Sequence, residues 1–171
     1  MRPSLRCAFA LATAALAGCA GHGHYGGLES RDIKALSEAD VAGLRAGRGM
    51  SLALAAELNG YPGPLHVLEL ADKLSLTSAQ TDATRSLYAR MKASAIAAGE
   101  GVIDAERALD RLFAARTVDE RQLDAALARV AEAQARLRGV HLQAHLEQVR
   151  ILRAEQVAEY NRLRGYGGGR P

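Results

Sequence analysis

Aromatic residues and cysteine are scarce in this sequence of 171 residues. Aromatic residues make up 4% of the chain, with two Phe, five Tyr and no Trp. Because strands favour β-branched and aromatic side chains, this scarcity argues against a β-sandwich or barrel. The two cysteines are too few for a disulfide framework. Hydrophobic residues nevertheless make up 49% of the chain, and most of them are Ala and Leu. Since these are strong helix formers, we predict an all-α protein.

Long hydrophobic runs are also absent, apart from a short one near the N-terminus. Arg2 and Arg6 precede an apolar run over residues 7–17. A membrane-spanning helix needs roughly 20 apolar residues, so this run is typical of a secretory signal peptide instead. It ends in Leu16-Ala17-Gly18-Cys19, which resembles the lipobox of bacterial lipoproteins. The resemblance implies that residues 1–18 are removed and that Cys19 carries the lipid. The alternative is an ordinary signal peptide with a chance cysteine.

The residue after the cysteine bears on localisation. In bacterial lipoproteins an Asp at this place retains the protein at the inner membrane, whereas here it is Ala20. The resemblance therefore implies a periplasmic protein anchored by its lipid to the outer membrane. Loss of the two signal-peptide arginines lowers the net charge from +3 to +1, and no basic block remains. We therefore expect no nucleic-acid partner.

Glycine-rich segments bound the body of the chain. Residues 19–30 include Gly21-His22-Gly23-His24-Tyr25-Gly26-Gly27 and are predicted to form a flexible tether, although the two histidines offer a weak metal-binding alternative. Residues 167–171 are predicted to be a disordered tail. Between these ends we expect two units. Residues 31–63 should hold short helices and a loop rich in Gly and Pro, and residues 64–166 should form one helical domain.

The short helices have recognisable start and stop signals. Ser37 and Asp40 form a capping pattern for a helix that ends near residue 45, before two glycines. A second short helix is predicted over residues 50–58 and ends at the turn sequence of residues 59–64. Pro64 suits the first turn of a third helix, which should reach about residue 74.

Two long helices follow. Thr77 and Gln80 form a capping box, and apolar or small residues then recur every three or four positions. The first long helix is predicted over residues 78–115, with its seam at Leu87, Met91, Ala95, Ala98, Val102, Ala105, Leu109 and Leu112. Gly99 and Gly101 interrupt it. They indicate a bend, a close helix crossing or a tolerated weak position.

A second capping box, Thr117 to Glu120, follows a turn at Arg116 and Thr117. It should open a helix that reaches about residue 152, with its seam at Leu123, Leu127, Val130, Gln134, Leu137 and His141. A last helix is predicted over residues 154–163. Two long helices joined by a short loop should fold back as an antiparallel hairpin. Because each seam is narrow, we expect a homodimer, or a short helix laid across the hairpin, to cover the remaining apolar surface.

The motif at the start of the first long helix carries a family resemblance. Leu76-Thr77-Ser78-Ala79-Gln80, in an exported chain, resembles the Leu-Thr-x-x-Gln motif of the periplasmic Spy/CpxP superfamily, which often has two copies. The second copy here is Leu152-Arg153-Ala154-Glu155-Gln156, in which Arg153 replaces Thr and cannot act as the N-cap. The resemblance covers residues 64–166.

The resemblance implies one of two non-enzymatic functions. The first is an ATP-independent chaperone, a dimer of helical hairpins that holds unfolded envelope proteins on its concave face. The second is metal binding in heavy-metal resistance or sensing, as in the CnrX-like and ZraP-like members. A structural or signalling lipoprotein that regulates an envelope sensor is a third alternative. An enzyme is not expected, because the sequence has no nucleophile elbow, phosphate loop or paired-carboxylate signature.

The histidines are the candidate metal ligands. His141 and His145 are four residues apart and share one helix face, a spacing that offers two ligands to a metal. A zinc-protease motif is excluded because residue 142 is Leu. By resemblance to CnrX-like proteins, His66 of the preceding helix, with Glu69 nearby, would complete a site for Ni²⁺, Co²⁺, Cu²⁺ or Zn²⁺. The alternative is that these are ordinary half-buried histidines.

The arginines of the long helices are the candidate client-binding residues. Basic side chains beside Leu and Ala would hold unfolded chains by mixed electrostatic and apolar contact. The alternative is a solvated helix surface with ion pairs within each helix. The candidates are Arg85, Arg90, Arg107, Arg111, Arg129, Arg136 and Arg150.

Overall fold

The computed structural model describes residues 25–166 and is all-helical over that range. The elements are η1 (Leu28–Ser30), α1 (Glu38–Arg45), α2 (Leu54–Glu57), α3 (Pro64–Glu69), α4 (Ser78–Ala114), α5 (Glu120–Ile151) and α6 (Ala154–Arg164). The predicted all-α class is therefore confirmed. The predicted signal peptide, Cys19, most of the tether and the tail lie outside the described residues. Within residues 25–166, no helix is both long enough and apolar enough to cross a membrane.

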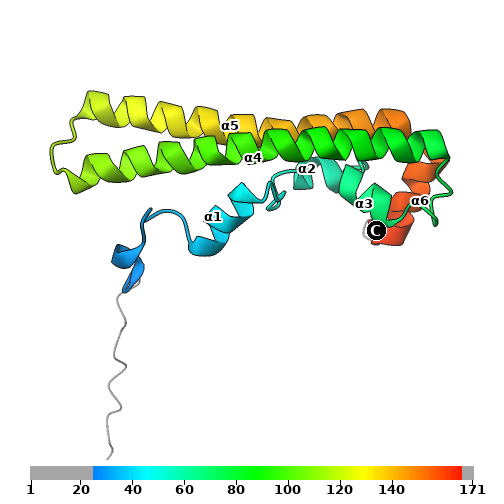
Figure 1. The fold of residues 1–171 in the computed structure, drawn as a ribbon, viewed down its shortest axis with the longest axis horizontal. Coiled ribbons are helices and arrows are strands. Elements are labelled where there is room, and N and C mark those ends of the chain that lie inside the picture. The colour runs from blue at the N-terminus through cyan, green and yellow to red at the C-terminus, as the bar shows by residue number, and fades with distance from the viewer. Residues whose placement is uncertain (1–24, 167–171) are drawn as a thin grey trace, which may run out of the picture.

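Helices α4 and α5 form a long pair that dominates the fold. The chain runs out along α4, turns, and returns beside it along α5 (Figure 1). The predicted capping box starts α4: the Gln80 N–H donates to Thr77 Oγ1 at 3.2 Å, and the Thr77 N–H donates to Gln80 Oε1 at 3.1 Å. The helix has 37 residues. This is about 55 Å at 1.5 Å per residue.

The predicted start of α5 was wrong by two residues. The N-cap is Asp119, whose Oδ1 accepts from the Gln122 N–H at 2.7 Å, while Gln122 Oε1 accepts from the Asp119 N–H at 3.0 Å. Asp caps at least as well as Thr, and Gln122 lies at the reciprocal position. Arg116 has a φ of 56° and turns the chain before this cap. Glu120 is consequently the first residue of the helix and not the partner of Thr117.

Two of the short helices are shorter than predicted. Helix α2 has four residues where residues 50–58 were expected, because Met50 and Ser51 have φ values of 42° and 65° and cannot belong to a helix. Helix α3 ends at Glu69, and hydrogen-bonded turns carry the chain on to Ser75, where φ is 48°. The predicted capping box of α1 is present, with the Asp40 N–H donating to Ser37 Oγ at 3.1 Å.

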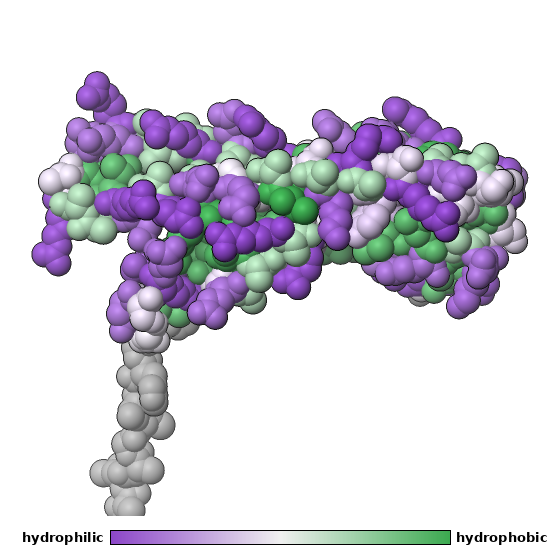
Figure 2. All heavy atoms as spheres, in the orientation of Figure 1, coloured by the Kyte–Doolittle hydropathy of each residue, from purple (hydrophilic) through white to green (hydrophobic). Residues whose placement is uncertain are grey.

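The short helices cover one side of the long pair. Helices α1 and α3 contact α4, and α2 and α3 contact α5. Apolar side chains gather where these elements meet, and hydrophilic ones cover much of the outer surface (Figure 2). One buried cluster consists of Ile33, Leu44, Ala95, Ala98, Val102, Ile103 and Leu137, and a second consists of Val67, Leu74, Leu152 and Tyr160. The predicted seam of α5 was wrong at Leu127 and Gln134, which are exposed, because the buried face of the helix passes through Ala126, Val130 and Leu137 instead.

The two glycines of α4 have different roles. A Cβ on Gly99 would lie 2.6 Å from the backbone oxygen of Leu44, so α1 crosses α4 in direct backbone contact there. A Cβ on Gly101 would meet no atom within 4 Å. Of the three alternatives for these residues, Gly99 therefore allows a close helix crossing, and Gly101 is a tolerated weak position in the helix.

Candidate functional site

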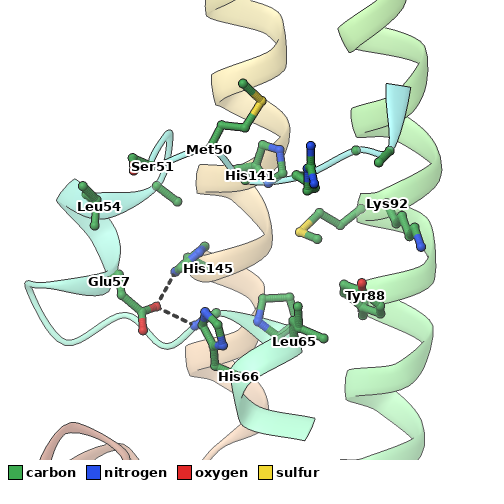
Figure 3. A pocket seen from close by; sticks show the side chains of 18 of the residues that line it. Met50, Ser51, Leu54, Glu57, Leu65, His66, Tyr88, Lys92, His141 and His145 are labelled. Atoms are coloured by element: carbon green, nitrogen blue, oxygen red, sulfur yellow. Dashed lines mark hydrogen bonds and ion pairs between the residues drawn. The ribbon is translucent and has the colours of Figure 1, made fainter. Parts of the chain in front are cut away.

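A cavity of about 540 Å³ lies between the long helix pair and the segment 46–66, which we call the arm. The arm contains α2 and the start of α3 and spans the side of the pair near the C-terminus (Figure 3). Tyr88 of α4, His141 and His145 of α5, and Arg164 of α6 complete the walls. A volume of this size is in the usual range of about 300–1,000 Å³ for small-molecule sites.

The three histidines predicted from the sequence all line this cavity. His141 and His145 are buried side chains of α5, and His66 is a half-exposed side chain of α3. The sequence spacing predicted that His141 and His145 share a face, and the structure places both toward the arm (Figure 3). Among the described residues, however, no group of three or more His, Cys, Asp and Glu side chains is arranged to hold a metal ion.

Two of these histidines already have partners. His145 Nδ1 lies 2.7 Å from the backbone oxygen of Tyr61, and since a carbonyl oxygen only accepts, this nitrogen carries the proton. The same atom is 3.6 Å from Glu57 Oε2. A Cβ on Gly63 would lie 3.2 Å from His145 Nε2, so the glycine backbone packs against that nitrogen. His66 Nδ1 lies 2.8 Å from Glu69 Oε2, the acidic residue three positions on.

His141 is the histidine without a partner. Its Nε2 is buried and makes no hydrogen bond in the described part of the chain. Burial lowers the pKa of His141, and the charge on neighbouring His145 lowers it further. The imidazole is therefore held in its neutral form beside a cavity, with one polar nitrogen unsatisfied.

Glu57 is the residue of this site that sequence reasoning missed. Its side chain is buried in α2, with 5% of its surface exposed. The Tyr160 hydroxyl donates to Oε1, and the Gly63 N–H donates to Oε2 at 3.1 Å. Arg164 Nε is 3.8 Å from Oε1. A carboxylate in a four-residue helix gives no sequence signal, because its partners are up to 107 residues away.

This carboxylate ties the arm to the C-terminal helix. Burial raises the pKa of Tyr160 well above its ordinary value, and the hydrogen bond to Glu57 raises it further. The phenol thus remains a donor to Glu57 under all ordinary conditions. Together, the contacts of Glu57 with Gly63, His145 and Tyr160 hold α2, the following loop, α5 and α6 in one arrangement.

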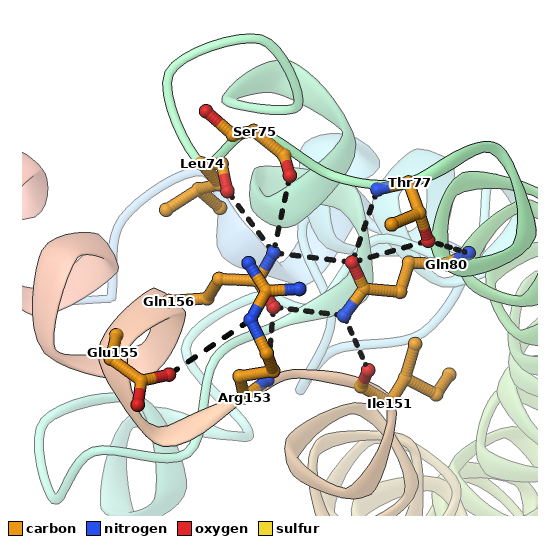
Figure 4. A network of polar contacts seen from close by, with 8 residues as sticks. All are labelled: Leu74, Ser75, Thr77, Gln80, Ile151, Arg153, Glu155 and Gln156. Atoms are coloured by element: carbon orange, nitrogen blue, oxygen red, sulfur yellow. Dashed lines mark hydrogen bonds and ion pairs between the residues drawn. The ribbon is translucent and has the colours of Figure 1, made fainter.

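The two copies of the Leu-Thr-x-x-Gln-like motif meet in space (Figure 4). Gln80 Nε2 donates to Gln156 Oε1 at 2.8 Å, and Gln156 Nε2 donates to Gln80 Oε1 at 3.1 Å. Each amide also reaches the backbone that precedes the other helix. Gln80 Nε2 donates to the oxygen of Ile151 at 2.9 Å, and Gln156 Nε2 donates to that of Leu74 at 3.1 Å. The motif thus caps two helices and joins them to each other.

Because Arg153 replaces Thr, the second capping box keeps only one of its two reciprocal hydrogen bonds. Arg153 occupies the N-cap position of α6, and its N–H donates to Gln156 Oε1 at 2.9 Å. As the sequence predicted, its side chain supplies no acceptor, because a guanidinium only donates. The guanidinium lies 3.9 Å from Glu155 instead. Leu76 packs beside the second apolar cluster, so every residue chosen from the motif belongs to this junction.

The arginines chosen as client-binding candidates lie along the exposed helix pair and away from the cavity. Four of them face acidic side chains: Arg85 with Asp82, Arg90 with Glu147, Arg107 with Asp104 and Asp32, and Arg136 with Glu132. Arg111, Arg129 and Arg150 form no ion pair within residues 25–166. The predicted alternative, a solvated surface with ion pairs within each helix, describes Arg85, Arg107 and Arg136, whereas Arg90 pairs with the other long helix.

Exposed apolar side chains gather on the arm instead. Nine large hydrophobic residues are exposed in the described part, and five of them lie between residues 50 and 65: Met50, Leu54, Leu58, Tyr61 and Leu65. Met50, Leu54 and Leu65 also line the cavity. We call these three residues the apolar rim. Clustered exposed apolar side chains are typical of interaction sites.

Comparison with known proteins adds no relative: no family model, curated protein or solved structure matches this chain. The resemblance to the Spy/CpxP superfamily therefore remains a prediction from the motif.

Proposed function

We propose that this protein is a non-enzymatic periplasmic lipoprotein that binds unfolded polypeptide segments as an ATP-independent chaperone. The observation that carries the proposal is the apolar rim, which stands beside a cavity of about 540 Å³. Binding through this surface needs neither a nucleotide nor a catalytic group. In this proposal the client binds to the arm, and not to the arginines of the long helices that were the candidates from the sequence.

The buried contacts of Glu57 support this proposal. An isolated loop with exposed Leu and Met side chains would collapse onto itself to bury them. Here the arm is fixed by the bonds of Glu57 to Gly63 and Tyr160 and by the bond of His145 to Tyr61. The apolar side chains are therefore held apart from the core and remain available to a client. This preorganisation lowers the entropic cost of binding.

An aggregation-suppression assay tests the proposal. Residues 20–171, which include every described residue, would be mixed with a denatured client at equal concentration. We expect reduced light scattering from the client. A variant with Leu54→Ser, Leu58→Ser and Leu65→Ser should lose the effect, because it removes apolar surface from the arm. The matched control, Leu146→Ser, removes an exposed leucine elsewhere on the molecule and should retain it. Unchanged client turbidity with the wild-type chain would exclude a chaperone.

We also propose that the long pair is an antiparallel hairpin that assembles as a homodimer. Beyond the short helices, α4 and α5 carry exposed Phe113 and Leu127, which a second copy would cover. Light scattering should give twice the chain mass at micromolar concentration. A monomeric mass that does not change with concentration would contradict it.

Divalent transition-metal binding is the second candidate. One observation favours it: three histidines predicted from the sequence line the same cavity, and His141 Nε2 has no partner there. Calorimetry with Ni²⁺, Co²⁺, Cu²⁺ and Zn²⁺ should then show binding that His141→Ala abolishes. Affinity no tighter than the millimolar range, or binding unchanged by His141→Ala, would exclude this function.

A further inference from the structure

We propose that the cavity recognises the free C-terminal carboxylate of an apolar polypeptide segment. This inference rests on the proposed function and names the chemical group by which a client would be held. Three features of the cavity carry it: the charge of its lining, the unsatisfied nitrogen of His141, and the position of the apolar rim.

The lining carries an excess of positive charge. Arg48, Lys92 and Arg164 are lining residues, and the only acidic one is Glu57. Both oxygens of Glu57 already accept hydrogen bonds, one from Tyr160 and one from Gly63. No other carboxylate of the lining balances the cations. The charge therefore favours an anion over a metal cation, so this inference and the metal hypothesis compete for one cavity.

The cations retain donors for a ligand. The Lys92 ammonium makes no hydrogen bond or ion pair within the described residues, and Arg48 makes one long bond of 3.4 Å to the oxygen of Ala39. A guanidinium has five N–H groups and pairs well with a carboxylate. Arg48 lies in the arm two residues before Met50, the first residue of the apolar rim. One segment thus supplies both a cation and an apolar side chain to the cavity.

His141 adds a buried polar atom to the same wall. Only 3% of the residue is exposed, and its Nε2 has no partner. Buried polar groups are almost always hydrogen-bonded, so an unsatisfied one beside a cavity is a place for a water or for a ligand atom. In the tautomer with the proton on Nε2, the ring would donate to a carboxylate oxygen. Figure 3 shows His141 on α5, facing the arm close to Met50.

The apolar rim specifies what is attached to the carboxylate. Leu54 and Leu65 line the same cavity as these donors, and the exposed Leu58 and Tyr61 lie on the arm outside the lining. A chain that places its carboxylate among the cations would run its preceding apolar side chains over this surface. A polypeptide long enough to follow the arm fits this arrangement better than a short fatty acid, which would end within the cavity.

Fluorescence anisotropy with residues 20–171 tests the inference. The probes are two peptides of eight Ala, Leu and Val residues with an N-terminal dye, one with a free C-terminus and one amidated. We expect the free acid to bind about ten-fold more tightly, as for a charge-assisted pair. Arg48→Gln should weaken only the free acid, and Arg138→Gln, an exposed arginine of α5, should weaken neither. Circular dichroism of both variants verifies the fold.

The outcomes separate this inference from the proposed function. If both peptides bind equally, the carboxylate inference is wrong and the chaperone proposal stands. If neither peptide binds, both proposals fail. Dodecanoate provides the remaining comparison, because it carries the same carboxylate on a lipid chain. Displacement of the free-acid peptide by dodecanoate at concentrations below the peptide's own Kd would assign the site to fatty acids and overturn the peptide assignment.

Discussion

The two ends of the long helix pair are stabilised in different ways. At the proximal end, where α4 begins and α5 finishes, the short helices and α6 surround the pair and buried polar groups link them. At the distal end, residues 112–130, the pair is covered only by itself, and Phe113 and Leu127 are 54% and 47% exposed. Most buried polar side chains lie at the proximal end, where partners come from several elements, whereas Glu106, further along α4, is bonded only to Gln134 of α5.

This difference separates two kinds of helix signal. The distal end has a capping box, Asp119 with Gln122, whose bonds are all local. The proximal end has the same kind of box at Thr77, but Gln80 also bonds to residues more than 70 positions away. Equivalent substitutions at the two ends should therefore have unequal effects.

Glu57→Ala should lower the free energy of unfolding by about 3 kcal/mol, because it leaves buried donors of Tyr160 and Gly63 without an acceptor. The matched change in the exposed helix surface is Glu132→Ala, which breaks an exposed ion pair with Arg136. It should cost less than about 0.5 kcal/mol. Urea unfolding followed by circular dichroism measures both. Equal effects would mean that Glu57 does not fix the arm.

Gly99→Ala should destabilise the fold by about 2 kcal/mol, because the new Cβ would overlap the backbone of Leu44 and force α1 away from α4. Gly101→Ala provides the control two residues on, where nothing obstructs a Cβ. It should stabilise by about 0.5–1 kcal/mol through helix propensity. If urea unfolding shows that Gly99→Ala lowers the free energy of unfolding and Gly101→Ala raises it, the close crossing of α1 and α4 is supported. A stabilising Gly99→Ala would refute it.

Gln156→Ala should cost about 1.5 kcal/mol, since it removes a buried amide bonded to Gln80 and to the backbone of Leu74. Gln122→Ala removes the corresponding residue of the distal box, which has only a local bond. It should cost about 0.5 kcal/mol. The same unfolding experiment ranks the two. A larger loss from Gln122→Ala would contradict the distinction between local and long-range capping.

Acid should weaken the proximal end through His141. Burial lowers the pKa of this imidazole in the folded state, so the unfolded chain binds a proton that the folded chain does not. The neutral ring contributes to the free energy of unfolding above the ordinary histidine pKa of about 6.5, and this contribution is lost as the pH falls below that value. When the pH is lowered from about 7.5 to about 5.5, the free energy of unfolding should therefore fall less for the His141→Leu variant than for the wild type. His66→Leu is the control, and if it matched His141→Leu, the effect could not be assigned to burial.

Features set by neighbouring residues were predictable from the sequence. The capping boxes at Ser37 and Thr77 placed the starts of α1 and α4, and the Ala- and Leu-rich composition gave the all-α class. The start of α5 was misplaced because two cap candidates, Thr117 and Asp119, lie two residues apart and only one has Gln at the reciprocal position. The positive φ values of Met50 and Ser51, which shorten α2, have no local sequence signal.

The histidines of the candidate site were predicted, but their surroundings were not. Helical spacing alone places His141 and His145 on one face. That they face an arm with an apolar rim, and that His145 is already bonded to Tyr61, depends on how residues 46–66 cross the long pair. The pairing of candidate arginines with acids depends in part on neighbours within one helix, as for Arg136, and in part on contacts between helices, as for Arg90.

Neighbouring residues were enough to place the caps of α1 and α4 and the two copies of the glutamine motif, because each depends on bonds within a few residues. Only the tertiary structure decided that Gln80 and Gln156 bond to each other, that Glu57 is buried against Tyr160, and that His141 has an unsatisfied nitrogen beside a cavity. The two bonded pairs join residues that are 76 and 103 positions apart in the sequence. Burial removes water, and each polar group must then find a partner in the protein or leave a place for a ligand.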